Sequence, residues 1–188
     1  MVDKGTGIWT LEEAKKRHRF DEGLARAIYD MYLPSSIADL GCGTGAYCRF
    51  FYEIGCEIVH GYEGTKDISQ IGLYKDIMML DLTKKRYSDL KYDLVICLEV
   101  GEHIPKKYED VMIWNIDQFV DKYLVLSWAI PRQGGLGHFN ERDNEYVIEK
   151  FAEKKLFLDL DRSNLLREKS TLKWFKSTVM AYERRPNS

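Results

Sequence analysis

An acidic string that contains a histidine follows an apolar run in this chain of 188 residues. In the string LEVGEH, one helical turn would place Glu99, Glu102 and His103 on a shared face. Two carboxylates and one imidazole suit a divalent cation. A later glycine-rich loop, residues 134–140, is flexible enough to bring in a second imidazole, that of His138. The residues therefore predict a metal site, with Mg²⁺ or Mn²⁺ as the expected ion.

Two other interpretations of these residues stay open. His138 could serve as a general base without any metal. An acidic turn with a histidine is also often a solvated part of the surface that carries no chemistry. If the residues are chemically active, the expected catalytic side chains are Glu102, His103 and His138.

A glycine-rich string, DLGCGTGA at residues 39–46, lies between a strand candidate and a helix candidate. Glycines there let the backbone turn sharply and approach a ligand closely. The spacing of Gly41, Gly43 and Ala46 fits the dinucleotide-binding pattern. Glu63 follows where an acid that binds ribose belongs. Spacing alone leaves three classes open: a nicotinamide-dependent oxidoreductase, an S-adenosylmethionine enzyme, and a cofactor-binding module without catalysis.

The longer string IADLGCGTG, which begins at Ile37, closely resembles the first motif of class I S-adenosylmethionine-dependent methyltransferases, in which an acid lies two residues before the first glycine. The resemblance extends over nearly the whole chain, to Tyr182. It implies that Asp39 and the glycine turn hold the methionine part of the cofactor. It also implies that Glu63 accepts hydrogen bonds from the ribose hydroxyls and that Asp81 contacts the adenine. The cofactor-binding residues expected on this basis are Asp39, Gly41, Cys42, Gly43, Gly45, Glu63, Asp81, Leu82 and Glu99.

The acidic string and the later loop histidine are similar to two metal-dependent branches of this superfamily. These are the 2′-O-methyltransferases of small-RNA 3′ ends and the O-methyltransferases of the ubiquinone pathway. The resemblance implies a divalent metal held by four side chains, Glu99, Glu102, His103 and His138. The gap from His103 to His138 is shorter than in the RNA enzymes, so the substrate stays open.

A metal at this place would act directly on the acceptor. Methyl transfer requires an oxygen aligned behind the methyl group and the loss of its proton. A divalent cation that grips one or two hydroxyls orients them and lowers their pKa. Such a site favours an acceptor with adjacent oxygens, such as a cis-diol of a sugar, a ribose terminus or a catechol.

The residues around the fifth strand candidate bear on the acceptor. The strings SWAIP, GHFN and NEYVI, at 127–131, 137–140 and 144–148, look like compact methyltransferases of large DNA viruses and microbes, some fused to glycosyltransferases and acting on a glycan sugar. We therefore expect a sugar hydroxyl as acceptor, an RNA ribose or a phenol as alternatives, and a fused or associated glycosyltransferase as a partner. The residues expected to wall the acceptor pocket are Trp128, Ile130, Pro131, Phe139 and Tyr146.

Short apolar runs alternate with longer amphipathic stretches, the pattern of βα units around a parallel sheet. The expected fold class is α/β, a Rossmann-like, doubly wound, mostly parallel seven-stranded sheet with helices on both faces, in a single domain. Strands are predicted at 37–40, 56–62, 77–82, 92–98 and 123–128, with a last pair at 156–160 and 178–182. Helices are predicted at 10–31, 45–54, 106–119 and 143–155.

The predicted elements divide the chain into three parts: an N-terminal helix and lid at 1–36, a methyltransferase core at 37–185 and a tail at 186–188. A capping box of Thr10 and Glu13 begins the first helix. Residues 5–20 are expected to fold over the cofactor. The remaining histidines, His18 and His60, are expected to have no role.

Composition and charge exclude several classes. With 45% hydrophobic residues the chain can bury a sizeable core, and 28 Lys and Arg against 30 Asp and Glu leave a formal charge of −2. The positive field of a polyanion-binding protein is absent, so an uncharged small-molecule or glycan acceptor is favoured over nucleic acid. Four cysteines without a CxxC pair, and no apolar leader or membrane-length run, predict reduced thiols and a soluble, cytoplasmic protein without a membrane partner. A viral protein in a host cell would fit as well.

Overall fold

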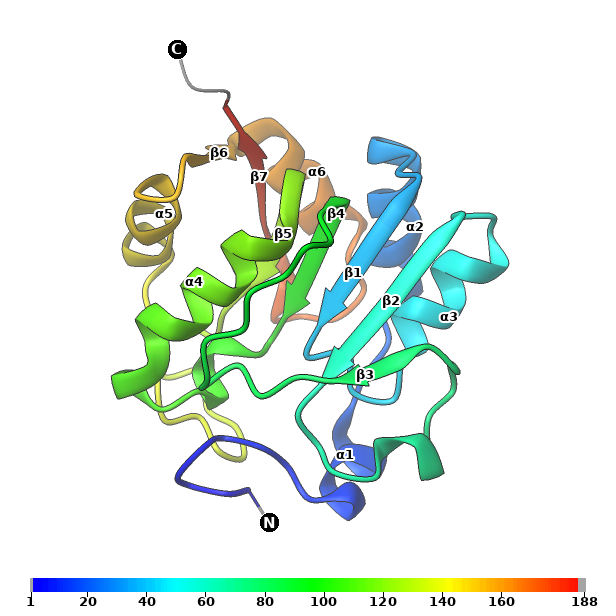
Figure 1. Cartoon of the computed structure of the whole chain (residues 1–188). Helices are drawn as coiled ribbons and strands as arrows, with labels where there is room; N and C mark the ends of the chain where they lie inside the picture. Colours follow the sequence, from blue (N-terminus) through cyan, green and yellow to red (C-terminus); the bar gives the residue numbers. More distant parts are fainter. Residues whose placement is uncertain (1, 186–188) are drawn as a thin grey trace.

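Seven strands form one sheet (Figure 1): β1 (Ser36–Leu40), β2 (Ile58–Glu63), β3 (Ile77–Met79), β4 (Tyr92–Leu98), β5 (Val120–Ser127), β6 (Leu156–Asp159) and β7 (Met180–Arg184). The structure is a computed structural model that describes residues 2–185, so the tail predicted at 186–188 lies outside the described residues. The strand order is β3-β2-β1-β4-β5-β7-β6. Strands β1 to β5 run parallel, whereas β7 is antiparallel to both β5 and β6.

The central strands are apolar on both faces, as buried parallel strands are. In β4, Leu94 and Ile96 belong to one core cluster, and Val95 and Cys97 belong to the other. All four side chains are fully buried. Because successive side chains point to opposite faces of a sheet, each face needs a cover of helices.

Helices cover both faces of the sheet (Figure 1). On one face pack α4 (Glu109–Phe119) and α5 (Asn144–Ala152). The other face is covered by α2 (Glu22–Tyr32), α3 (Ala46–Glu53), α6 (Leu160–Lys169) and α7 (Phe175–Thr178). Shorter elements are α1 (Leu11–Arg17) and the 3₁₀ turns η1 (Ile68–Gln70), η2 (Gly101–His103) and η3 (Lys106–Tyr108). The predicted fold class is confirmed, including the pairing of the last two strands.

The first predicted helix, 10–31, is wrong as a single element. The capping residue Thr10 does begin α1, but α1 ends at Arg17 and α2 begins only at Glu22. Asp21 separates the two helices because its carboxylate caps α2, accepting from the backbone N–H of Leu24 at 3.0 Å. The same carboxylate also accepts from the N–H groups of Thr171 and Leu172, at 2.7 and 2.8 Å.

A second difference concerns α6, which lies between the last two strands where no helix was predicted. Asp159 caps the start of the helix, because its carboxylate accepts from the N–H of Arg162 at 2.9 Å. Its sequence is mostly polar, and its fully buried side chains are Ser163 and Leu166. So small a buried face produces no clear helical periodicity.

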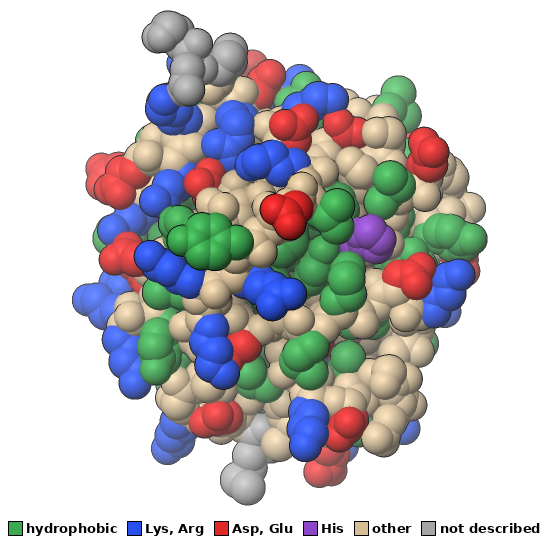
Figure 2. All heavy atoms as spheres, in the orientation of Figure 1, with side chains coloured by type: hydrophobic (Ala, Val, Ile, Leu, Met, Phe, Trp, Pro, Cys, Tyr) green, Lys and Arg blue, Asp and Glu red, His purple; other side chains and the backbone are tan. Residues whose placement is uncertain are grey.

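The surface agrees with the near-neutral charge. On the face drawn in Figure 2, basic and acidic side chains are interspersed, so the two signs largely offset each other there. Among residues 2–185, none of the helices is both long and apolar enough to cross a bilayer.

Candidate active site

A cavity of about 1030 Å³ opens at the carboxyl ends of β1, β2 and β4. This edge is where doubly wound sheets bind their ligands. Every residue predicted to bind the cofactor, to hold a metal or to act in catalysis lines the cavity, except Gly43 and Gly45. The cavity therefore brings these predicted residues together, and the geometry decides what each of them can do.

The glycine-rich turn joins β1 to α3 with a backbone that favours glycine. Gly41 and Gly43 have φ values of +78° and +56°, in the left-handed region. A β-carbon on Gly41 would lie 2.4 Å from a methyl carbon of Val100. The N–H of Gly41 donates to the carbonyl of Tyr62 at 2.8 Å, which fixes the turn against β2.

Two acids lie beside this turn, at the ends of β1 and β2. Glu63 accepts from the N–H of Gly43 at 2.9 Å and from the N–H of Thr65 at 2.8 Å. Asp39 is almost fully buried, with the Cys48 thiol 3.6 Å from its carboxylate. Burial raises the pKa of Asp39 to about 7, and the charge of Glu63 adds to the rise. A cationic group of a ligand would favour the ionised form of Asp39.

Asp81 lines the cavity beyond β3 and is held by its own loop. Its carboxylate accepts from the hydroxyl and the N–H of Thr83, at 2.6 and 3.0 Å, and pairs with Lys84 at 3.0 Å. The side chain therefore has a defined position at the rim of the site.

Glu102 is the most unusual acid of the site. The 3₁₀ turn η2 places it at the cavity, where it is fully buried and neither carboxylate oxygen has a hydrogen-bond partner among the described residues. Burial raises its pKa well above the ordinary value, and the charge of Glu99 raises it further. Ligand atoms of Glu102, His103 and His138 all lie within 4.8 Å of one another.

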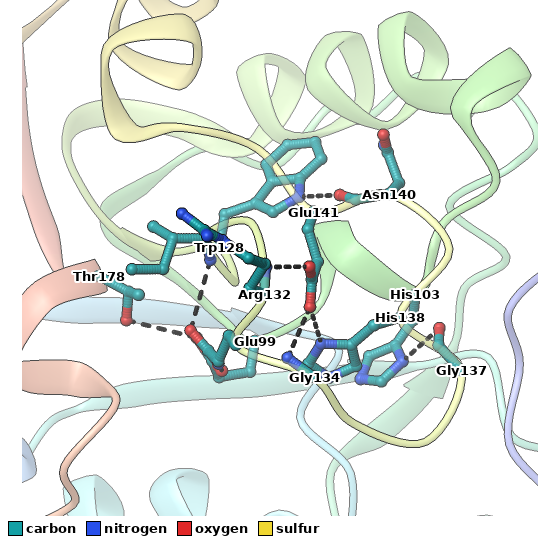
Figure 3. Close-up of polar contacts among 12 residues, drawn as sticks. Glu99, His103, Trp128, Arg132, Gly134, Gly137, His138, Asn140, Glu141 and Thr178 are labelled. Atoms are coloured by element: carbon teal, nitrogen blue, oxygen red, sulfur yellow. Dashed lines mark hydrogen bonds and ion pairs between the residues drawn. The ribbon is translucent and has the colours of Figure 1, made fainter.

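The two histidines of this group are oriented through their Nδ1 atoms (Figure 3). His103 Nδ1 lies 3.1 Å from the carbonyl oxygen of Gly137, and His138 Nδ1 lies 3.2 Å from a carboxylate oxygen of Glu141. The rings meet edge to face at 5.0 Å. Burial lowers the pKa of His103 to about 4. The Nε2 atom of each ring therefore has no hydrogen-bond partner among the residues that the structure describes.

Glu99 departs from the predicted single helical face. Its φ is +54°, so the helical turn begins only after it, at Gly101. Its carboxylate accepts from Gln133 Nε2 at 2.7 Å and from the Thr178 hydroxyl at 3.5 Å (Figure 3). Within the described residues, the group of close ligand atoms therefore has three of the four expected members, with Glu99 beside it.

A family model described as a methyltransferase domain matches residues 13–117, more than half of the chain. The chain belongs to this methyltransferase family. The match includes β1, the glycine turn, β2, β4 and η2, which carry most of the site. The predicted enzyme family, that of the methyltransferases, is confirmed.

A curated relative of this methyltransferase is the magnesium-protoporphyrin O-methyltransferase of Synechocystis sp.. The two are 29% identical over an alignment of 128 positions, which covers 62% of this chain and 54% of the relative. The chain thus spans about half the length of that protein.

Solved structures share the fold over most of this methyltransferase. The magnesium protoporphyrin IX methyltransferase from Synechocystis with bound S-adenosylmethionine superposes with a TM-score of 0.62 at 19% identity, covering 93% of this chain and 79% of that one. An amino pentose methyltransferase from Micromonospora echinaspora with bound S-adenosylmethionine superposes with a TM-score of 0.66 at 15% identity. The superposition covers 93% of this chain and 91% of that one. These likenesses confirm the fold class.

The predicted acceptor wall is wrong for this methyltransferase. None of its five residues is among those that line the cavity. Trp128 is buried in the core and its Nε1 donates to the carbonyl of Asn140 at 2.6 Å (Figure 3). Tyr146 donates its hydroxyl hydrogen to Glu109. Trp128, which directly follows the central strand β5, packs in the core. Residues 133–136 line the cavity instead of the predicted wall.

The N-terminal segment lies along the cavity and contributes the rings of Trp9, His18 and Phe20. Trp9 stacks on His18, with ring centroids 5.4 Å apart, and meets His103 edge to face at 5.0 Å. The sequence analysis assigned no role to His18, yet its ring lines the cavity. The signal available in the sequence was its place within the predicted lid. His60, in contrast, hydrogen-bonds the hydroxyl of Tyr92 at 2.7 Å, outside the cavity lining.

Proposed function

We propose that this methyltransferase moves the methyl group of S-adenosylmethionine to a hydroxyl group, assisted by a divalent cation bound by Glu102, His103 and His138. One observation carries the metal: Glu102 is fully buried with both carboxylate oxygens unpartnered among residues 2–185. A buried carboxylate is costly unless a cation or a donor lies beside it. Two imidazole nitrogens within 4.8 Å complete a donor set that suits Mg²⁺ or Mn²⁺.

The cofactor proposal rests on the glycine turn and its acids. The two solved structures described above hold S-adenosylmethionine in the same fold. In this chain, Glu63 ends β2 at the cavity, where ribose hydroxyls could donate to it. The cationic amino group of the methionine part would lie beside Asp39 and favour its ionised form. Asp81, which also lines the cavity, would contact the adenine.

The proposed reaction requires alignment and removal of one proton. The acceptor oxygen forms a bond to the methyl carbon, the bond from that carbon to sulfur breaks, and the hydroxyl proton passes to a base or to water. A bound divalent cation supplies orientation of the hydroxyl and a lower hydroxyl pKa. The residues that would hold such a cation are Glu102, through its carboxylate, and His103 and His138, through Nε2. The contact of His103 Nδ1 with the Gly137 carbonyl keeps the imidazole proton on Nδ1 and leaves Nε2 free to bind.

The acceptor we propose is a sugar hydroxyl, with a glycosyltransferase as the class of enzyme that supplies it. A cation at this place favours neighbouring oxygens on the acceptor, and a sugar diol presents them. The interspersed charges on the face in Figure 2 and the net charge of −2 favour an uncharged acceptor over RNA.

The test is a transfer assay with labelled S-adenosylmethionine against sugars, phenols and RNA ends. Each acceptor is assayed in EDTA and again with added Mg²⁺ or Mn²⁺. We expect transfer to a sugar that the metal restores after chelation. Full activity in EDTA would remove the metal and leave His138 as a general base, whereas transfer to RNA or a phenol alone would replace the sugar.

Binding measurements separate the cofactor from the metal. Calorimetric titration should show that S-adenosylhomocysteine binds and NAD does not, and the opposite result would overturn the cofactor proposal. Glu102→Gln should lose the metal response while it still binds S-adenosylhomocysteine. The matched control is Glu12→Gln, because the Glu12 side chain is 74% exposed and pairs with Lys16 on the surface.

A further inference from the structure

Glu141 gathers three hydrogen-bond donors of the loop that carries His138 (Figure 3). One carboxylate oxygen accepts from the N–H of Gly134 at 2.7 Å and lies 3.2 Å from His138 Nδ1. The other oxygen accepts from the N–H of Arg132 at 2.7 Å. This side chain therefore joins the beginning of the loop to the histidine near its end.

The loop needs these contacts because its backbone is in an uncommon conformation. Arg132 and Gly134 have φ values of +73° and +71°, which cost energy for a residue with a side chain. At the other end, the N–H groups of Phe139 and Asn140 donate to the carbonyl oxygen of Glu102, at 2.8 and 3.0 Å. The backbone near His138 is thus attached to η2, and the remaining freedom is the rotation and the tautomer of the imidazole.

The contact with Glu141 removes that freedom. A carboxylate is an acceptor only, so it requires the proton of a neutral His138 to sit on Nδ1. The lone pair is then on Nε2, the nitrogen that a metal or a substrate proton would meet. Only a residue without a side chain fits beside this atom, because a β-carbon at Gly135 would lie 2.1 Å from His138 Nε2.

We propose that Glu141 is the positioning residue of His138, holding the Nδ1–H tautomer and presenting Nε2 to Glu102 and His103. The use of Nε2 to bind a metal rests on the proposed function. The tautomer itself can be measured in metal-free protein. Carboxylates that accept from a metal-binding histidine commonly change metal affinity about 10–100-fold when they are replaced.

The decisive variant is Glu141→Gln. Glutamine offers one carbonyl oxygen in place of two carboxylate oxygens. With that oxygen accepting from the N–H of Arg132, the amide nitrogen gives up the contact with Gly134, donates to His138 Nδ1 and favours the Nε2–H tautomer. Long-range ¹H–¹⁵N NMR correlations of the imidazoles should show His138 protonated on Nδ1 in the wild type and on Nε2 in Glu141→Gln. The chain has four histidines, so a His138→Gln sample assigns the signal.

Mn²⁺ titration followed by EPR gives the second readout. We expect Glu141→Gln to bind Mn²⁺ about 10–100-fold more weakly than the wild type, and Glu141→Asp to recover part of the loss. Affinity for S-adenosylhomocysteine should be unchanged in both. Glu145→Gln is the control, because Glu145 is an exposed acid close by on α5.

The outcomes separate the two proposals. A wild-type His138 protonated on Nε2, or a Glu141→Gln protein with the wild-type tautomer, overturns the role of Glu141. A wild type that shows the Nδ1–H tautomer but binds no Mn²⁺ supports the positioning by Glu141 and overturns the metal. Loss of S-adenosylhomocysteine binding together with a lowered unfolding temperature in Glu141→Gln would show a loop support only, and also overturns the role.

Discussion

The imidazole of His18 lies directly against the α-carbon of Gly43, so that a β-carbon built there would be 2.4 Å from His18 Nδ1. His18 also stacks on Trp9. Through this contact the N-terminal segment packs on the glycine turn at the centre of the proposed cofactor site. Gly43 has two functions in this position: it permits a φ of +56° and it leaves room for the histidine.

We predict that Gly43→Ala weakens S-adenosylhomocysteine binding at least about 10-fold. The left-handed backbone alone costs roughly 1–2 kcal/mol with a β-carbon, and the imidazole must move as well. Gly55→Ala is the matched control, since Gly55 has a φ of +103° but lies outside the cavity lining, and its added β-carbon would come no closer than 3.9 Å to the Tyr29 hydroxyl. Calorimetric titration of both variants isolates the His18 contact; equal affinities would show that the contact is unimportant.

The buried Asp39 carboxyl predicts a pH dependence of stability. Its pKa is about 7 in the folded protein and near 3.8 ordinarily, because burial disfavours the charged form. Between about pH 4 and pH 7, the folded state therefore holds a proton that the unfolded chain has released. The contribution of Asp39 to stability falls as pH rises through this window and is constant above it.

Urea unfolding at several pH values checks this expectation on Asp39→Asn and the wild type, both without ligand. The difference in unfolding free energy should change in favour of the variant from pH 4 to pH 7, and S-adenosylhomocysteine binding should be lost in the variant. Parallel pH profiles of the two proteins would contradict the buried-acid explanation.

The strands were predictable because parallel core strands are apolar without interruption. The prediction for β4, Tyr92–Leu98, matches the structure residue by residue. The break between α1 and α2 could not be predicted from neighbouring residues. Asp21 is fixed by the N–H groups of Thr171 and Leu172, which lie about 150 residues away in the chain. Long-range contacts of this kind leave no periodic signal in the sequence.

The site was predictable in its residue types and less so in its geometry. Glu102, His103 and His138 come together as expected from the acidic string and the later loop. The string could not show that Glu99 would adopt a left-handed backbone and contact Gln133. Glu141 was missed because its partners are defined by the folded loop, although an acid three residues after a loop histidine was visible in the sequence.

The buried carboxylate of Glu109 is expected to stabilise the loop that follows β5. Its carboxylate is 4% exposed and accepts from Asn140 Nδ2 at 2.9 Å, from Arg142 Nε at 2.7 Å and from the Tyr146 hydroxyl. Glu109→Ala leaves the guanidinium without its partner, which should cost about 3–5 kcal/mol. At about 2–4 °C per kcal/mol the unfolding temperature should fall by roughly 10 °C.

Differential scanning calorimetry of Glu109→Ala against Glu12→Ala measures this cost. Glu12 pairs with Lys16 at 2.6 Å, but both side chains are exposed, so that variant should lose no more than about 1 kcal/mol. A similar, small change in both proteins would show that the buried network contributes little to stability.

The unpartnered Glu102 predicts that one substitution stabilises the metal-free protein and abolishes its metal response. Glu102→Met replaces a buried polar group by an apolar side chain of similar length, and so removes a penalty of about 1–3 kcal/mol. In EDTA its unfolding temperature should exceed that of the wild type by roughly 2–10 °C. Added Mn²⁺ should raise the unfolding temperature of the wild type only, because a ligand stabilises the state that binds it.

Thermal unfolding in EDTA and in Mn²⁺ gives both comparisons, with the exposed Glu145→Met as control. The control should keep the wild-type response to Mn²⁺. A Glu102→Met protein that is less stable in EDTA would mean that the carboxylate has a stabilising partner in the free protein. If the variant also kept the rise in Mn²⁺, the cation would bind elsewhere. We expect Glu102→Met to be more stable in EDTA and to show no rise of the unfolding temperature in Mn²⁺. That combination would mean that the buried acid serves to bind a ligand.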